Sequence, residues 1–404
     1  MNQDNSKELL DYPFRSPSAL EPPTEWAQLR DKCPVAHVRL PSGDSAVLLT
    51  RHSDVRQLLS DPRFSHNLSA EGAARTTANE EGSVFESKDA ALLADSERHQ
   101  GWRRMIMKWF TAKRIAAMQQ RIESMAESLI DSMVKQGGPA DLTAHLGYPL
   151  PVWVICDVLG IPDVDRDKLA YWSNTMLSMT QYSQAEINAA QQEFTQYLLS
   201  HIEEKRKNPG DDLLSELSAA AGPGQSVPAE LLLMTAKGLL VAGHETTSNM
   251  IGKMMGMLLS VPSRWQQLLS DPSLVRTAVE ESLRFDANPG FGLPRYVSVD
   301  TEVGGTLIPR GTTVICSMGA ANRDERAYEQ SDEMHLERSP NPHLSFGAGP
   351  HSCIGQALAR TELQTVLSVL LRRLPTLALA VPVDELSARH GLLIGGLERL
   401  MVRW

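Results

Sequence analysis

The stretch PHLSFGAGPHSCIGQALARTELQTVL, residues 342–367, decides what this chain can fold into. A glycine-rich loop carrying Gly347 and Gly349 leads to Cys353, and a helix is predicted from near that cysteine to about Leu374. Glycines let the backbone come close to a bulky, flat ligand. The unpaired N–H groups and the dipole at a helix start favour a thiolate. We therefore predict that Cys353 is presented on the loop as a ligand for a soft metal centre.

Two other roles for Cys353 stay open on this segment alone. Free cysteines are commonly buried and inert, and Cys353 would then only fill space at a helix start. Alternatively, Cys353 would be a nucleophile with His351 as its base.

Composition excludes several classes of protein. The 404 residues include 39 Lys and Arg against 49 Asp and Glu, a formal net charge of −10, so no nucleic-acid partner is expected. The hydrophobic share of 42% is typical of a globular chain. Four scattered cysteines, Cys33, Cys156, Cys316 and Cys353, form neither a disulfide framework nor a zinc ribbon.

Targeting and membrane signals are not predicted. The start, MNQDNSKELLDYPF, has no basic region followed by an apolar one. The apolar segment 231–243 is short and contains Lys237, and charges and a proline interrupt residues 366–383, whereas a span needs about 20 apolar residues. We expect a soluble, cytoplasmic protein without a membrane partner.

The patterns along the chain predict a mainly α protein with minor β structure, as one integrated domain over residues 1–404. Helical periodicity covers about 54–285 and 353–374, with strong helices over 96–136 and 228–260. Short strands and turns are predicted at about 30–50, 287–320 and 380–404. Residues 65–94 read as a long loop.

The segment GLLVAGHETTSNM, Gly238–Met250, places an acid and hydroxyls inside an apolar helix. A Thr246 hydroxyl tends to bond to a preceding carbonyl and bend the helix. Beside a cavity, such a bend can hold water and relay protons with Glu245; otherwise the hydroxyls are only satisfied locally. The zinc motif HExxH is excluded, because Ser248 stands where its second histidine belongs.

The segment TAVEESLRFDANP, Thr277–Pro289, puts Glu281 and Arg284 on one helix face. In isolation, this pair would be a surface ion pair worth less than about 1 kcal/mol. Nucleotide motifs are not matched: GxxxxGK[ST] is missing, and the run at Gly347 lacks the last glycine of GxGxxG.

The three segments in this order resemble the cytochrome P450 family, specifically its soluble bacterial members. The AGxET helix, the ExxR pair and the FGxGxHxCxG loop stand here as residues 242–246, 281–284 and 346–355. The resemblance spans nearly the whole chain. It departs from the family at Ser96-Glu97-Arg98, where a proline-rich turn is usual, and at Gly101, where arginine is usual.

The resemblance implies a P450 fold with haem b held between the long central helix and the cysteine loop. Cys353 would be the axial thiolate of the iron, with Phe346, Gly347 and Gly355 around the cofactor. The haem propionates would pair with His99, Arg103, Arg295 and His351. Glu281, Arg284 and Arg338 would form a structural network.

The resemblance also implies that Thr246 and Glu245 deliver protons to dioxygen, unless Thr246 only positions water. The activity would be that of a haem-thiolate monooxygenase oxidising a largely apolar natural-product intermediate. Oxidative ring closure or coupling, a peroxide-driven reaction, and haem binding or sensing without turnover are the alternatives.

Substrate and redox partners follow from the same resemblance. The pocket would be lined by Met176, Met179, Leu240, Val241, Asn288, Phe291, Leu293 and Ile394. The chain contains no flavin or cysteine-rich segment, so electrons from NAD(P)H would come through a separate ferredoxin and ferredoxin reductase to a monomer. A basic patch would attract an acidic ferredoxin and comprises Arg104, Lys108, Lys113, Arg114 and Arg360.

Overall fold

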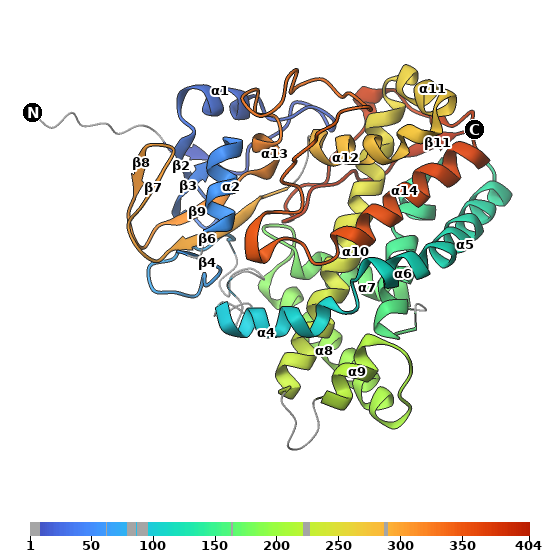
Figure 1. Cartoon of the computed structure of the whole chain (residues 1–404), viewed down its shortest axis with the longest axis horizontal. Coiled ribbons are helices and arrows are strands. Elements are labelled where there is room, and N and C mark those ends of the chain that lie inside the picture. The colour runs from blue at the N-terminus through green and yellow to red at the C-terminus, as the bar shows by residue number, and fades with distance from the viewer. Residues whose placement is uncertain are drawn as a thin grey trace, which may run out of the picture.

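A large helical body and a smaller β-rich region make up the computed structural model of the chain (Figure 1). It describes residues 9–61, 63–78, 86, 96–162, 165–220, 227–286 and 290–404. The prediction of a mainly α chain with minor β structure is confirmed. The helices are α1 (Thr24–Lys32), α2 (His52–Ser60), α4 (Ser96–Met107), α5 (Ala112–Gln136), α6 (Pro149–Leu159), α7 (Arg166–Met176), α8 (Gln184–Lys207), α9 (Leu213–Ala220), α10 (Ala229–Leu259), α11 (Pro262–Ser270), α12 (Val275–Phe285), α13 (Met318–Ala321) and α14 (Gln356–Arg373).

The largest sheet has six strands in the order β1-β2-β3-β9-β6-β4. A parallel pairing of Val47 with Val314 joins β3 to β9, and Arg295 on β6 stands opposite Val314. Residues far apart in sequence therefore meet at one edge of the helical body. The strands of the three sheets are β1 (Leu10–Asp11), β2 (Val35–Arg39), β3 (Ser45–Leu49), β4 (Phe64–Ser65), β5 (Ala140–Asp141), β6 (Leu293–Val297), β7 (Thr301–Val303), β8 (Thr306–Ile308), β9 (Thr313–Cys316), β10 (Ala378–Leu379) and β11 (Met401–Arg403).

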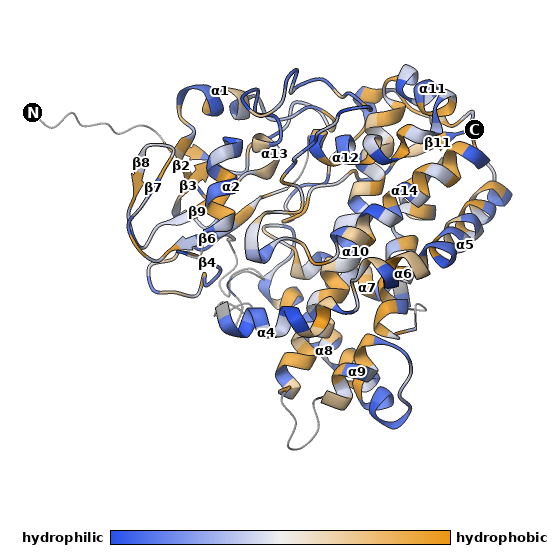
Figure 2. Cartoon of the chain, viewed as in Figure 1, coloured by the Kyte–Doolittle hydropathy of each residue, from blue (hydrophilic) through white to orange (hydrophobic). Residues whose placement is uncertain are grey.

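The central element is α10, which runs through the helical body and packs on α6 and α14. Apolar residues cover most of its surface, so it is buried on nearly all sides, as a helix apolar all round must be. Figure 2 shows hydrophobic residues along much of α10 and α6. No described helix is long and apolar enough to cross a membrane.

Two parts of the predicted pattern differ in the structure. The helical region 96–136 is divided, because the side chain of Thr111 caps a new helix by accepting from the N–H of Arg114. The strands expected over 380–404 are reduced to β11. Residues 387–398 instead form a folded-back turn, in which the N–H of Arg389 donates to Gly396 and that of Glu398 to Ser387.

Helix α10 approaches α6 closely enough to need a glycine. A Cβ atom on Gly243 would lie 2.7 Å from Cγ1 of Ile155, whereas one on Gly238 would meet nothing within 4 Å. We expect Gly243→Ala to lower the free energy of unfolding by about 1–3 kcal/mol through overpacking. Gly238→Ala, its matched control, should raise that free energy by up to about 1 kcal/mol. Urea denaturation of both variants tests this, and equal effects would contradict the packing argument.

Candidate functional site

The loop before α14 is fixed by its own backbone and by α2. The N–H of Cys353 donates to the carbonyl of Phe346 at 2.8 Å. Gly347 and Gly349 have φ of +69° and +70°, where other residues are strained. A Cβ atom on Gly349 would also lie 2.7 Å from Cα of Ser60. The loop therefore brings Cys353 to the start of α14 in one defined conformation.

The thiol of Cys353 is accessible, yet it is set among protein atoms. Burial raises the pKa of Cys353, and the N–H of Gly355 and the charges of Arg103 and Arg360 offset only part of that rise. The thiol alone is thus protonated at neutral pH. A bound metal ion deprotonates a coordinating thiol outright, so these surroundings suit a metal ligand better than a free nucleophile.

His351 is not placed to act as a base for Cys353. Its ring stacks between those of His66 and His99, with centroid distances of 3.7 and 3.8 Å. Burial and the neighbouring positive groups lower the pKa of His351 to about 3. The nucleophile alternative therefore finds no support in this geometry.

Five cationic or proton-donating side chains converge beside the cysteine loop. The structure brings the predicted His99, Arg103, Arg295 and His351 together and adds His66. Arg295 is 4% exposed, and burial lowers its pKa to about 10. Nε2 of His66 is buried without a hydrogen-bond partner, and none of the five forms an ion pair with a carboxylate of the described chain. A buried arginine such as Arg295 without a counter-ion is costly, so this cluster fits an anionic ligand such as a pair of carboxylates.

Sequence reasoning missed His66, which lies in the stretch interpreted as a long loop. The pairing of Ser65 with Tyr296 joins β4 to β6 and carries His66 next to Arg295. No local pattern around residue 66 indicates this, because the partner strand lies more than 200 residues away in the chain.

One face of α10 stays open where the rest of the helix is buried. Ala242 and Thr246 are four residues apart, share that face and are exposed. The Thr246 hydroxyl donates to the Ala242 carbonyl at 2.9 Å, as expected for a helix-interior threonine. Small or short side chains on this face leave it uncovered, like the thiol of Cys353. The thiol, the donor set and this uncovered helix face together fit haem.

Glu245, the neighbour of Thr246, is buried in a polar cluster on another face of α10. Its carboxylate accepts from Nδ2 of Asn249 at 3.2 Å and lies 3.6 Å from Nε2 of His244 and 3.7 Å from Arg389. Burial alone would raise the pKa of Glu245, but His244, Arg389 and Asn249 together lower it. Glu245 is therefore ionised at neutral pH.

The predicted network on α12 is fully buried, so its interpretation as a surface ion pair is wrong. Arg284 makes two bonds of 2.8 Å to Glu281, and both side chains are 0% exposed. Arg338 donates to both oxygens of Glu281 at 3.1 Å. Burial would raise the pKa of Glu281, but Arg284, the N–H of His335 and Arg338 lower it. These donors keep the buried carboxylate ionised.

The network reaches the cysteine loop through Asn322. Arg284 donates to the carbonyl of Asn322, whose side chain accepts from the N–H of Leu344 at 2.7 Å and donates to Ser345 at 2.9 Å. The ion pair of Glu281 and Arg284 thereby fixes the start of the loop.

Glu280, which belongs to none of the sequence motifs, provides a second connection between α12 and the cysteine loop. It binds Arg360 of α14 through two bonds of 2.7 and 3.0 Å and His343 at 3.0 Å. The guanidinium of Arg360 also lies over the ring of Phe346, 4.3 Å from its centroid. Burial opposes ionisation of Glu280, but His343 and Arg360 lower its pKa to about 2.

The predicted pocket residues fall into two groups. Met179, Leu240, Val241 and Phe291 are buried within the core, whereas Met176, Leu293 and Ile394 are partly buried against it. Backbone bonds join their segments: the N–H of Phe291 donates to Leu393, and that of Leu393 to Leu177. Asn288 lies outside the described residues.

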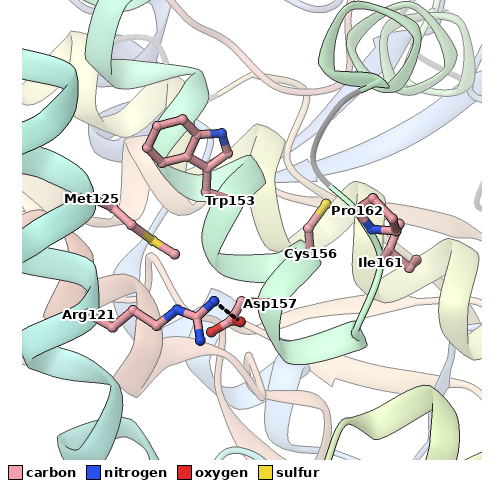
Figure 3. A pocket seen from close by; sticks show the side chains of 7 residues that line it. All are labelled: Arg121, Met125, Trp153, Cys156, Asp157, Ile161 and Pro162. Atoms are coloured by element: carbon pink, nitrogen blue, oxygen red, sulfur yellow. Dashed lines mark ion pairs between the residues drawn. The ribbon is translucent and has the colours of Figure 1, made fainter. Parts of the chain in front are cut away.

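A separate recess of about 330 Å³ opens between α5 and α6 (Figure 3). Trp153 and Met125 form walls, and Arg121 pairs with Asp157 across it at 2.7 Å. None of the predicted site residues lines this recess, so it is not part of the cysteine site.

Comparison with known proteins decides the family. The family model for cytochrome P450 matches residues 169–378. The chain belongs to the cytochrome P450 family. It is 40% identical to nocardicin C N-oxygenase of Nocardia uniformis subsp. tsuyamanensis, over 97% of this chain and 98% of that protein. It is 38% identical to mycinamicin IV hydroxylase/epoxidase of Micromonospora griseorubida, over 99% and 100%.

Solved structures agree with this P450 assignment. The putative thioether synthase SgvP, involved in the tailoring step of griseoviridin, superposes with a TM-score of 0.92 at 38% identity, covering 98% of this chain and 100% of that one. CYP105P1 in complex with filipin I gives 0.91 at 35% identity, covering 98% and 99%. The predicted single-domain P450 fold is confirmed, and the chain is a P450 monooxygenase. The family implies a haem-thiolate cofactor, a small-molecule substrate and redox partners.

The histidine stack predicts acid sensitivity of the haem-free P450. Burial first, and then the positive neighbours, lower the pKa of His66 to about 2 and of His351 to about 3, far below the unfolded value of 6.5. Below pH 6.5, His66 and His351 become protonated in the unfolded chain but stay neutral in the folded chain. Each such proton weakens folding by up to about 1.4 kcal/mol per pH unit. Stability should thus fall as pH drops from 6.5 toward 3.

His66→Gln tests this directly. It should reduce the loss of stability of the haem-free protein between pH 6.5 and 5, measured by urea denaturation. His37→Gln, an exposed control on β2, should leave the loss unchanged. An identical pH profile for His66→Gln and the wild type would contradict the argument.

Proposed function

We propose that this P450 hydroxylates a largely apolar natural-product intermediate, and that the thiolate of Cys353 would hold the iron of haem b. The observation that carries the proposal is the accessible Cys353 thiol beside a cluster of histidines and arginines, among them the buried Arg295, that has no carboxylate partner in the described chain. The names of the relatives, which include an N-oxygenase and a hydroxylase/epoxidase acting on nocardicin C and mycinamicin IV, support a substrate from secondary metabolism.

Each residue of the site would have a distinct role toward the haem. Cys353 would bind the iron, and the N–H of Gly355 would stabilise its negative charge. His66, His99, Arg103, Arg295 and His351 would hold the two propionates through charge-assisted hydrogen bonds. Haem bound with a thiolate ligand supplies the activation of dioxygen. Thr246, exposed on α10, would hold a proton at Oγ1 facing the bound group, and Glu245 would renew it.

The substrate would lie on the same open face of α10 as Ala242 and Thr246. Met176 and Ile394, both partly buried, would line an apolar pocket that methionine side chains can adapt. Leu240 and Phe291 would support this pocket from the core.

Electrons would come from NAD(P)H through a ferredoxin and its reductase to a monomeric, cytoplasmic enzyme.

Three of the five residues of the basic patch form ion pairs within the chain and are therefore less available to a partner protein. Lys108 pairs with Glu216, Arg114 with Asp211, and Arg360 with Glu280. Arg104 and Lys113 form no ion pair with the described residues and would be its main contacts with an acidic partner.

The test of haem-thiolate ligation is spectroscopic. The reduced protein with carbon monoxide should show the red-shifted Soret band of thiolate ligation, and Cys353→Ala should lose it. Cys316→Ala, a buried cysteine on β9, should retain the band. Purification without haem, or the same band in Cys353→Ala, would refute the proposal.

Thr246→Ala tests the use of dioxygen. For any compound that a Soret-shift screen identifies, loss of the hydroxyl should lower the product formed per NADH at least about tenfold and release peroxide instead. Thr246→Ser keeps the hydroxyl and should retain coupling. A peroxide-driven enzyme would instead give the same peroxide-supported rate in all three proteins.

Oxidative ring closure or coupling is the second candidate. It is favoured by the close superposition on SgvP, which is described as a putative thioether synthase. Product mass distinguishes the two: hydroxylation adds one oxygen atom, whereas ring closure removes two hydrogen atoms.

A further inference from the structure

Tyr12, near the start of the chain, is held at the edge of the largest sheet. It follows β1, and its N–H donates to the carbonyl of Arg39, the last residue of β2, at 2.8 Å. Its side chain is 4% exposed, and its ring lies edge-on to that of Phe14, with centroids 5.3 Å apart. Burial raises the pKa of Tyr12, and a hydrogen bond with Ser317 offsets only part of that rise. The hydroxyl therefore stays protonated and keeps a proton to donate.

The hydroxyl of Tyr12 donates to the carbonyl of Phe291, 279 residues further along the chain. The two rings also contact each other, with centroids 5.3 Å apart and planes inclined by 58°. Phe291 is 1% exposed and lies just before β6, in a segment that contributes to the predicted substrate pocket. A buried carbonyl needs a donor, and the hydroxyl of Tyr12 supplies it.

Glycines on both sides of Phe291 let it fit between the largest sheet and the turn of residues 387–398. Gly290 and Gly292 have φ of +94° and +96°. A Cβ atom on Gly290 would lie 2.2 Å from the carbonyl oxygen of Leu393, and one on Gly292 would lie 2.6 Å from that of Cys316. The backbone around Phe291 is therefore in close contact with both neighbours and moves only together with them.

Two further backbone bonds continue from Phe291 across the pocket. Its N–H donates to the carbonyl of Leu393 at 3.0 Å, and the N–H of Leu393 donates to the carbonyl of Leu177 at 2.8 Å. Met176 ends α7 just before Leu177, and Ile394 follows Leu393; both are predicted pocket residues. A continuous chain of hydrogen bonds thus runs from Tyr12 through the pocket wall to the end of α7.

The same wall reaches the cysteine loop through Leu293. This residue begins β6, two positions after Phe291, and is partly buried. A Cβ atom on Gly347 would lie 3.9 Å from Cδ1 of Leu293. A shift of Phe291 would therefore be passed on to a side chain beside the loop of Cys353 as well as to the turn.

We propose that Tyr12 is a positioning residue that fixes the wall of the substrate pocket through the carbonyl of Phe291. Its ring and hydroxyl hold Phe291 in place, and the bonds of Phe291 and Leu393 carry that position to the end of α7. Tyr12 thereby influences which ligands fit beside the haem without lining the pocket itself. The inference rests on the proposed function, because it takes Met176, Leu293 and Ile394 as residues of the pocket.

Tyr12→Phe tests the hydrogen bond alone, because it keeps the ring and removes the donor. In the haem-loaded protein without added ligand, the N–H groups of Phe291 and Leu393 should exchange with deuterated solvent at least about tenfold faster than in the wild type, since loss of one bond loosens the next. Mass spectrometry of the peptides that contain these residues measures the exchange.

Two controls separate this chain of bonds from a general effect. The N–H of Ala380 bonds to Met401 at 2.8 Å in another sheet, and it should exchange at the wild-type rate in Tyr12→Phe. Tyr296→Phe removes a comparable bond at the surface, from a tyrosine hydroxyl to the carbonyl of Glu71 at 3.2 Å. This variant should leave the N–H of Phe291 as protected as in the wild type.

Azole binding tests the effect on the pocket. Imidazole and 4-phenylimidazole bind haem iron through a nitrogen and shift the Soret band, so the Kd of each can be measured without the natural substrate. Imidazole is small, whereas the added phenyl ring must lie against the pocket wall. Because a loosened wall has to be ordered on binding, Tyr12→Phe should raise the Kd of 4-phenylimidazole at least about threefold and leave that of imidazole unchanged. Tyr296→Phe should change neither.

The outcomes separate the two levels of the proposal. Faster exchange at Phe291 and Leu393 alone, with a raised Kd for 4-phenylimidazole alone, supports the role of Tyr12. Unchanged exchange at Phe291, or an unchanged or lowered ratio of the two Kd values, overturns it. Equal acceleration at Ala380, or an equal rise of both Kd values, would show that Tyr12 only stabilises the fold. A wild type without the thiolate band with carbon monoxide would overturn the proposed function, and the exchange rates would still decide whether Tyr12 holds Phe291 in place.

Discussion

The buried bidentate pair of Arg284 and Glu281 is the constraint on which the rest of the site depends. Two charges with no solvent exposure are tolerable only when nearly every donor and acceptor is used. Arg284 meets this requirement by binding the carbonyls of Asn322, Ser331 and Glu333 besides Glu281. Those carbonyls belong to the irregular chain before the cysteine loop. A stretch with little regular secondary structure thereby gains a fixed course, and Cys353 gains its position.

The same need to pair buried charges explains why two carboxylates lie side by side on α12. Glu281 points into the network of Arg284 and Arg338, while Glu280 binds Arg360 on α14. One helix turn thus anchors both ends of the cysteine loop, the first through Asn322 and the second through the helix that follows Cys353. A helix periodicity of 3.6 residues is what allows adjacent glutamates to face different partners.

Much of the site could be predicted from local sequence, because its motifs are contiguous. The loop around Cys353, the open threonine of α10 and the pair on α12 each lie within ten residues, where spacing determines which side chains share a face. His66 and Arg389 could not be found this way. Their positions depend on β4 pairing with β6 and on a turn folding back onto α7 and α10, which are tertiary contacts without a local signal. The strands expected over 380–404 are only partly present, as β11, because residues 387–398 fold back on themselves and also bond to the end of α7.

The two charged clusters of the site differ in how far the chain itself compensates their charges. Near the loop, the arginines are positive, whereas burial first, and then the positive neighbours, lower the pKa of His66 and His351 so that these rings are neutral. An anionic ligand would stabilise this cluster. Glu245 is already compensated within the chain, because His244 first, and then Arg389 and Asn249, offset the effect of burial on its pKa. An anionic cofactor would therefore complete the first cluster, whereas the second is complete within the chain itself. Because α10 carries both Thr246, on its open face, and Glu245, in the second cluster, a single helix connects the two parts of the site.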